Sequence, residues 1–229
     1  MITLIDASRR GFDADGPQDI LAPTSLVIGA GERVGILAAR GSGKSVIARL
    51  LCGIDQPDSG AVLRRGRLSW PLGSAGALHP DLTVAENIGI IARLTGEDPL
   101  SLTALCELLG SLTPILHRPM KTVSPAQRAA VAWCLAAGVT CDTYIADDTI
   151  GFGLDRQRDL SEAFLLQRLE TAGLVFLSSN PQQIARFCQR FHVLIAGRLI
   201  PCPDLAAGQA ALVAANPLYA PAFAEVLDD

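Results

Sequence analysis

The sequence predicts an α/β fold with a mostly parallel sheet, a small antiparallel β subdomain and an inserted helical subdomain. Short apolar runs rich in β-forming residues recur between helical stretches, which is typical of a parallel sheet covered by helices. One of these runs leads straight into a glycine-rich turn and an apolar helix. With 229 residues and 49% hydrophobic content, the chain can bury one large α/β core. We therefore expect a single domain over residues 1–229.

The β-rich runs follow one another along the chain. The N-terminal segment MITLIDASRR places its charges after its apolar residues, the reverse of a secretory signal, so we interpret it as a first strand. Further strands are predicted at residues 26–28, 33–38, 143–147, 174–178 and 192–195. The turn QPDSG at 56–60 leads into residues 61–63, which we assign to the antiparallel subdomain.

Helical periodicity dominates the middle of the chain. Between about Thr83 and Pro119, the segments VAENIGIIARL and SLTALCELLGSL carry apolar residues at three- and four-residue spacing. We place the inserted helical subdomain at about 83–135. The alanine-rich tail at 204–229 predicts a helix that docks on the domain.

The glycine-rich turn has the residues of a phosphate-binding loop. Residues 33–45 read RVGILAARGSGKS, a strand followed by the turn. Backbone N–H groups in such a turn curl around a β-phosphate, and the following helix adds the positive end of its dipole. Lys44 would reach the β/γ oxygens, and Ser45 would offer its hydroxyl to Mg²⁺. Ala38 stands where this pattern usually begins with glycine, and it fits if its φ stays negative.

A second apolar strand ends in two carboxylates. The segment DTYIADD at residues 142–148 supplies the acidic half of a nucleotide site. Asp147 would hold Mg²⁺ directly or through water. Asp148 takes the next position, where a carboxylate would polarise the attacking water.

Composition argues against several other classes of protein. The net charge of −4 leaves no excess of basic residues for a nucleic-acid backbone. The longest nearly unbroken apolar stretch, Ala129–Val139, has about half of the roughly 20 residues that a membrane-spanning helix needs, so no direct membrane insertion is expected. The six cysteines form no C-x-x-C pair and read as buried reduced thiols in a cytoplasmic protein. The three histidines lie far apart, so we expect no metal beyond nucleotide-bound Mg²⁺.

The order of these motifs resembles the ATP-binding subunits of ABC transporters, and more narrowly those that export capsular polysaccharide. The resemblance covers the chain to about residue 203. It is carried by GERVGILAARGSGKSVIARLLCGIDQPDSG, LSWPLGSAGALHPDLTVAENI, MKTVSPAQRAAVAW, DTYIADD and LSSNPQQIARFCQRFHVLIAGRLI. It implies a P-loop NTPase core of the ABC type that binds ATP with Mg²⁺. It also implies a homodimer, or a heterodimer with another ABC ATPase, held at the inner face of the cell membrane by a permease.

The resemblance also implies roles for individual residues. Ser45 and Asp147 would bind the metal, and Asp148 and Ser179 would be catalytic. The loop at Leu154 and Asp155 would reach toward a second subunit. Nucleotide contacts are expected from Arg40, Gly41, Ser42, Gly43, Lys44, Ser45, Val46 and, across the dimer, Ser124.

Several departures from the family pattern fall on catalytic positions. Pro125 and Ala126 follow Ser124 in the signature segment, so one N–H donor is lost and a methyl is added near the γ-phosphate. Ser179 stands at the position of the switch histidine, and its hydroxyl carries no charge. Asp148 replaces a glutamate.

Two further family residues are missing. No glutamine occurs between Trp70 and Ser74. Gly11 follows two arginines where a tyrosine that stacks on adenine is usual, and Phe12 is the aromatic residue nearby. Two functions therefore remain open. One is a slow ATPase that powers polysaccharide export, and the other is a non-hydrolysing regulatory or structural partner of an intact ABC ATPase.

Overall fold

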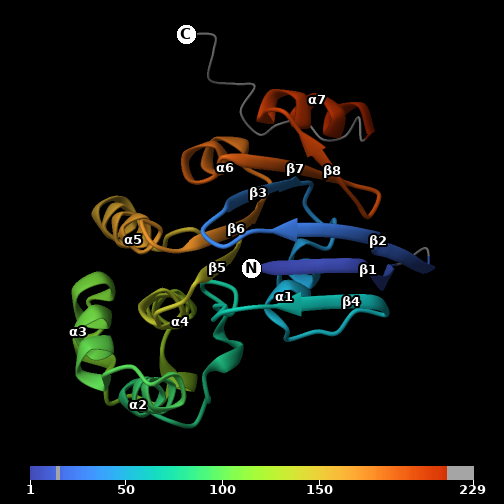
Figure 1. Cartoon of the computed structure of the whole chain (residues 1–229). Helices are drawn as coiled ribbons and strands as arrows, with labels where there is room; N and C mark the ends of the chain where they lie inside the picture. The colour runs from blue at the N-terminus through green and yellow to red at the C-terminus, as the bar shows by residue number, and fades with distance from the viewer. Residues whose placement is uncertain (14–15, 216–229) are drawn as a thin grey trace, which may run out of the picture. The chain divides into compact units, whose positions relative to one another are not determined.

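The computed structural model describes residues 1–13 and 16–215 (Figure 1). The chain divides into two compact units, and each is described by itself. The first consists of Met1 and residues 29–31 and 64–174. The second consists of residues 2–28 and 32–63 and the chain from 175 onward.

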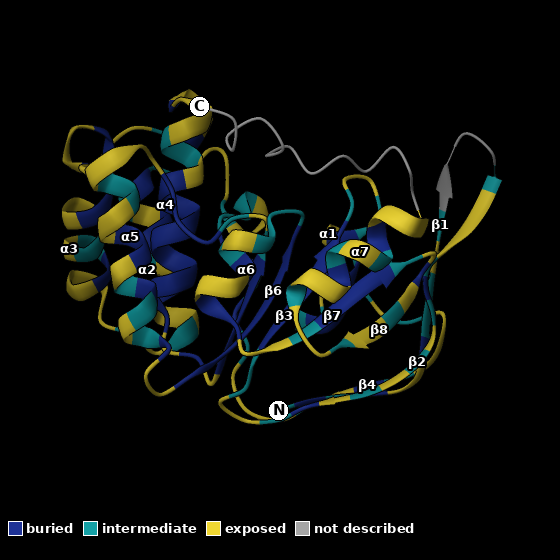
Figure 2. Cartoon of the chain, turned by 90° about the horizontal axis from the view of Figure 1, so that it is seen from above, coloured by how far each residue is buried: buried dark blue, intermediate teal, exposed yellow. Residues whose placement is uncertain are grey.

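The first unit is mostly helical. Its elements are α2 (Val84–Thr95), α3 (Pro99–Gly110), α4 (Pro125–Gly138), β5 (Thr143–Asp147) and α5 (Asp155–Arg168). Local signals start three of these helices: Thr83 and Ser124 each form a capping box, and Asp98 caps the helix that begins with Pro99. Helix α4 is the buried centre of this unit (Figure 2). Its Trp133 is 0% exposed and packs on Phe152, with ring centroids 5.2 Å apart.

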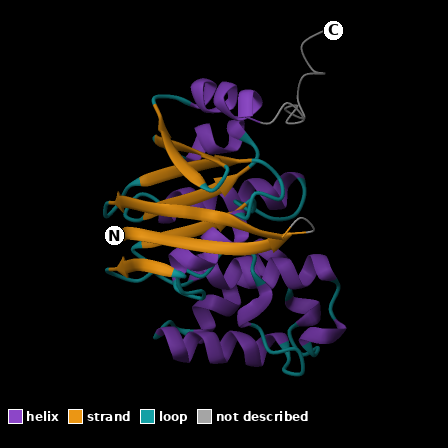
Figure 3. Cartoon of the chain, turned by 90° about the vertical axis from the view of Figure 1, so that its right-hand side faces the viewer, coloured by secondary structure: helices purple, strands orange, loops and turns teal. Residues whose placement is uncertain are grey.

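Apart from Arg64, the second unit contains a small sheet with strand order β2-β1-β4, formed by β1 (Ile2–Asp13), β2 (Gly16–Ile28) and β4 (Ser59–Arg64). The antiparallel pair β1 and β2 makes the longest strands (Figure 3). Its register slips where Arg9 pairs with Leu21 but Arg10 pairs with Asp19, so Ile20 is an extra residue in β2. Such a β-bulge redirects a side chain.

The larger sheet has the strand order β5-β6-β3-β7-β8. Its other strands are β6 (Gly173–Ser178), β3 (Arg33–Ala38), β7 (Arg190–Ile195) and β8 (Arg198–Cys202). Strands β3 and β7 are parallel, and β7 and β8 are antiparallel. Every residue of β6 and all but the first of β3 are buried, which explains their continuous apolar sequences.

Helices α1 (Lys44–Cys52), α6 (Pro181–Phe187) and α7 (Leu205–Ala215) belong to the second unit. Helix α6 approaches β3 closely at Gly35, where an added Cβ would overlap the Cγ2 methyl of Ile184. Cys188, just beyond α6, also lies against Gly35, and burial raises the pKa of its thiol to about 12. The thiol therefore stays protonated and acts as a packing group.

The α/β class and the strands at 33–38 and 143–147 are confirmed, and the helical segments expected at 84–94 and 101–112 lie mainly in α2 and α3. Residues 26–28 are only the end of β2, and residues 61–63 are the middle of β4. Strand β8 was not expected. The tail helix is present up to Ala215, and residues 216–229 lie outside the described part. Cys52 and Cys202 are half-buried, contrary to expectation, whereas the other four cysteines are buried. Within the described residues, none of the helices has both the length and the apolar character needed to cross a bilayer.

Candidate nucleotide-binding site

The turn between β3 and α1 has the backbone of a phosphate loop. Gly41 and Gly43 have φ values of 77° and 87°, which favour glycine. Ala38 is the buried last residue of β3. In the described part of the chain, the non-glycine residues with positive φ are Asp6, Ser111, Asp148, Asp155 and Ala196, so Ala38 bears no left-handed strain. The alanine in place of the usual first glycine is therefore compatible with the loop.

The carbonyl oxygen of Ala39 closes this loop. It accepts hydrogen bonds from the Ser42 hydroxyl at 2.8 Å, the Ser42 N–H at 3.4 Å and the Lys44 ammonium at 3.0 Å. Lys44 is 6% exposed, whereas Arg40 and Ser45 are exposed. The first turn of α1 has no acidic residue, so no carboxylate of that turn offsets the positive end of the helix dipole. The loop is thus arranged to receive an anion.

Ile20, the bulged residue of β2, lies beside the loop. A Cβ added at Gly43 would overlap its Cγ2 methyl, and one added at Gly11 of β1 would overlap its Cδ1. The half-buried Ile20 side chain therefore lies against both glycines. The expected aromatic residue is absent at Gly11, and the side chain of Phe12 lies outside the described part.

In the first unit, the acidic residues stand where β5 ends. Asp147 is half-buried and Asp148 is exposed. Asp148 has a φ of 52°, and the N–H of Thr149 donates to the Asp147 carbonyl at 2.6 Å. Aspartate tolerates this left-handed conformation better than most residues. The tight turn fixes the direction in which the two carboxylates leave the strand.

The segment containing Trp70 runs beside β5. The Ile145 N–H donates to the Ser69 hydroxyl at 2.9 Å, and the Leu72 N–H donates to the Ile145 carbonyl at 2.9 Å. Gly73 then lies against Thr149, to which an added Cβ would be 3.2 Å distant. The stretch from Trp70 to Ser74, which lacks the family's glutamine, therefore lies at the end of the acidic strand.

Two serines complete the set of site residues predicted from the sequence. Ser124 is the exposed N-cap of α4, where its hydroxyl accepts from the Gln127 N–H at 3.2 Å. Pro125 occupies the first helical position, where a missing N–H costs the helix nothing. Ser179 is half-buried and follows β6 in the second unit, and β6 is the neighbour of β3 in the sheet.

The oxygen donors predicted for a metal suit Mg²⁺. The described residues contain no group of three or more His, Cys, Asp and Glu side chains able to hold a metal by themselves. The Ser45 hydroxyl and the Asp147 carboxylate are instead two hard oxygen ligands. Magnesium is commonly bound by one or two such groups together with water and substrate phosphates. The donor chemistry therefore fits a metal that arrives with a nucleotide.

The second unit contains residues 40–46 and Ser179, and the first contains Ser124, Asp147 and Asp148. The loop geometry agrees with the roles expected for residues 40–46, and the roles themselves stay predictions. The sequence did not predict a role for Ile20, because a bulge depends on how two strands pair and cannot be recognised from the sequence of one strand.

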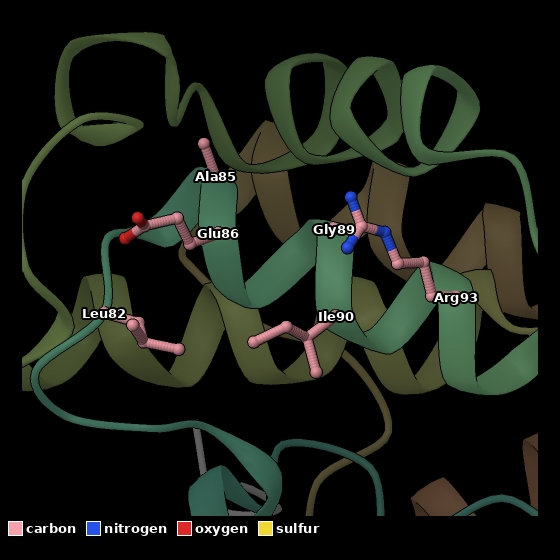
Figure 4. A pocket seen from close by; sticks show the side chains of 6 residues that line it. All are labelled: Leu82, Ala85, Glu86, Gly89, Ile90 and Arg93. Atoms are coloured by element: carbon pink, nitrogen blue, oxygen red, sulfur yellow. The ribbon is translucent and has the colours of Figure 1, made fainter.

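A separate shallow pocket of about 410 Å³ lies on the surface of α2 (Figure 4). It is lined by Leu82, Ala85, Glu86, Gly89, Ile90 and Arg93. Glu86 is held by the Thr83 capping box, which lowers the pKa of its carboxyl through hydrogen bonds to the carboxylate. Arg93 is exposed and, within the described residues, its side chain has no hydrogen-bond or ion-pair partner. The pocket therefore combines apolar side chains with one carboxylate and one guanidinium.

Comparison with known proteins gives one family. The model of the family "ABC transporter" matches residues 21–151, more than half of the chain. The chain is 29% identical over 205 residues to the capsule polysaccharide export ATP-binding protein CtrD of Neisseria meningitidis serogroup B, covering 90% of this chain and 95% of that protein. It is 29% identical over 197 residues to the ATP-binding protein BexA of Haemophilus influenzae, with coverages of 86% and 91%.

Solved structures agree on the fold. The ATP-binding subunit of an ABC transporter superposes with a TM-score of 0.72 at 22% identity, covering 93% of this chain and 94% of that one. A dimeric bacterial ABC transporter cassette gives 0.70 at 20% identity, with coverages of 87% and 96%. The phosphate loop, the acidic strand and these likenesses agree, and the chain belongs to the ABC transporter family.

Proposed function

We propose that this chain is the ATP-binding subunit of an ABC transporter that exports a capsular or other cell-surface polysaccharide. The observation that carries the proposal is the phosphate loop, with Gly41 and Gly43 in left-handed conformations and Lys44 buried against the Ala39 carbonyl. The polysaccharide is inferred from the printed function of CtrD. We further propose one domain over 1–229, with a helical subdomain at about 83–135 and a tail at 204–229.

In this proposal the loop binds the phosphates of ATP. Backbone N–H groups of residues 41–45 and the Lys44 ammonium bind the phosphates, with Arg40, Val46 and Ser124 of a second subunit as further contacts. Mg²⁺ would be held by Ser45 and Asp147, and it would neutralise charge on the phosphates. Asp148 orients a water that attacks the γ-phosphorus. The bond to the bridging oxygen then breaks, releasing ADP and phosphate.

Hydrolysis by this chain should be slow. An aspartate at position 148 is one methylene shorter than a glutamate, and misplacement by about 1 Å can cost about 10²-fold in rate. The uncharged Ser179 and the proline after Ser124 remove further stabilisation of the γ-phosphate. The alternative is a nucleotide-binding partner that has lost turnover and supports an intact ABC ATPase. The three substitutions at catalytic positions favour it, and a turnover measurement separates the two.

Attachment to the membrane would come from a permease. The pocket on α2 and the exposed leucines Leu94, Leu100 and Leu108 of α2 and α3 are apolar surface groups of the helical subdomain that a protein partner can cover. We propose that this surface, with the loop around Trp70, contacts a permease at the inner face of the cell membrane. A second ATP-binding subunit, identical or different, would complete the dimer.

The experiment measures thermal stability with and without millimolar Mg·ATP. We expect the wild type to gain stability on ATP addition and Lys44→Ala to show no gain. The exposed residue Arg198 lies in the same unit, so Arg198→Ala serves as the matched control and should respond as the wild type does. A wild type without an ATP-dependent shift would refute nucleotide binding. Wild-type turnover above about 1 s⁻¹ without a partner would refute the slow-ATPase reasoning, because typical enzymes begin near that rate.

A further inference from the structure

The phosphate loop contains a second cation, Arg40, beside Lys44, and the part of the nucleotide that it would contact has not yet been specified. Arg40 follows Ala39 and precedes Gly41, so it stands within the turn itself. Its side chain is exposed, and within the described residues it has no hydrogen-bond or ion-pair partner. Two other exposed arginines of this unit are paired: Arg49 with Asp55 at 2.8 Å and Arg190 with Glu32 at 3.0 Å. A guanidinium whose charge has no carboxylate partner, in a loop that binds anions, is suited to bind an anionic ligand.

The backbone just before Arg40 is held by hydrogen bonds. The Ala39 carbonyl accepts three hydrogen bonds from Ser42 and Lys44, which closes the turn beneath Arg40. On the other side Gly41 is left-handed, and nothing lies within 4 Å of the position that its Cβ would occupy. The exposed Arg40 therefore lies between a hydrogen-bonded residue and an open position of the turn. Only the side chain has to become ordered when an anion binds, which limits the entropy cost.

The chemistry of the loop indicates which phosphate Arg40 meets. Backbone N–H groups of such a loop hold the α- and β-phosphates, and the lysine reaches the β/γ oxygens. Lys44 is buried within the turn, whereas Arg40 reaches into solvent beyond it. The oxygens that the backbone does not already hold are those of the γ-phosphate. A guanidinium can bind two of them at once through its planar pair of donors.

We propose that Arg40 binds the γ-phosphate of the nucleotide and makes the loop selective for the triphosphate over the diphosphate. The proposal rests on the proposed function, because it requires a nucleotide in this loop. It also assigns a compensating cation to a site in which Ser179 offers only a hydroxyl. The positive charge that neutralises the γ-phosphate would then come from the same loop that binds the β-phosphate.

The test compares the affinities for a non-hydrolysable ATP analogue and for ADP, both with Mg²⁺, by isothermal titration calorimetry. Arg40→Ala should weaken analogue binding about 10- to 100-fold, as expected for a lost hydrogen bond between charged groups, and ADP binding less than about threefold. Arg40→Lys keeps the charge but loses the paired donors, so its loss for the analogue should be intermediate. Arg198→Ala, an exposed arginine of β8, should change neither affinity.

The possible outcomes separate this inference from the proposed function. Equal losses for both nucleotides would overturn it, because Arg40 would then act on the shared phosphates or on the fold of the loop. Unchanged affinities in Arg40→Ala would overturn it too. If the wild type binds neither nucleotide, and Lys44→Ala behaves like the wild type, the proposed function fails instead. Thermal unfolding of each variant without nucleotide would show whether the fold is intact.

Discussion

Alanine substitution at the two left-handed glycines of the phosphate loop should have unequal effects. A Cβ at Gly41 meets nothing within 4 Å, whereas a Cβ at Gly43 overlaps the Ile20 side chain. In both variants an alanine in the left-handed region lowers the free energy of unfolding by about 1–2 kcal/mol. Gly43→Ala must also displace Ile20, and overpacking of this kind typically costs about 1–3 kcal/mol. We expect the free energy of unfolding to fall by about 1–2 kcal/mol in Gly41→Ala and by about 2–5 kcal/mol in Gly43→Ala.

Urea unfolding followed by far-UV circular dichroism measures these losses. Combining each substitution with Ile20→Ala in a double-mutant cycle isolates the contact with Ile20. The Gly43 cycle should give a coupling energy of about 1–3 kcal/mol, and the Gly41 cycle a value near zero. Equal losses in the two glycine variants, or equal coupling energies, would show that Ile20 does not lie against Gly43. The bulge in β2 would then have no part in shaping the loop.

Three other predictions concern the core, acidity and the missing aromatic residue. Trp133→Ala should lower the free energy of unfolding by about 3–5 kcal/mol, whereas Trp133→Phe should cost far less, because the buried indole N–H has no hydrogen-bond partner among the described residues. Burial lowers the pKa of His192; the charge of Arg190 adds to this effect, and that of Glu32 opposes it. The imidazole therefore binds a proton more tightly in the unfolded chain than in the folded one. Stability should therefore fall as the pH drops below about 6.5, and urea midpoints of His192→Leu should depend less on pH over that range. Gly11→Tyr alone should not strengthen ATP binding in calorimetry, since Ile20 fills that space, and adding Ile20→Ala should allow it. Stronger binding in the single variant would contradict the contact.

The sequence by itself determined the parts of this protein that depend on neighbouring residues. The run from Arg33 to Ser45 dictates a strand, a left-handed turn and a helix start, because the apolar strand, the glycines and the helix formers act over a few positions. Apolar periodicity likewise placed α2 and α3, and the local capping residues Thr83 and Asp98 start them in the structure. The family followed from the order of such local motifs.

Strand extent and side-chain direction were decided only by the tertiary structure. Most of β2 alternates between exposed and half-buried residues, so only its apolar end was recognised, and β8 is specified by its pairing with β7. Ile20 points at the phosphate loop because the pairing of β1 with β2 slips there, and Gly35 is required because α6 packs against β3. These features arise from contacts between segments far apart in the chain. Local propensity carries no record of such contacts, whereas hydrogen-bond register and close packing fix them once the chain has folded.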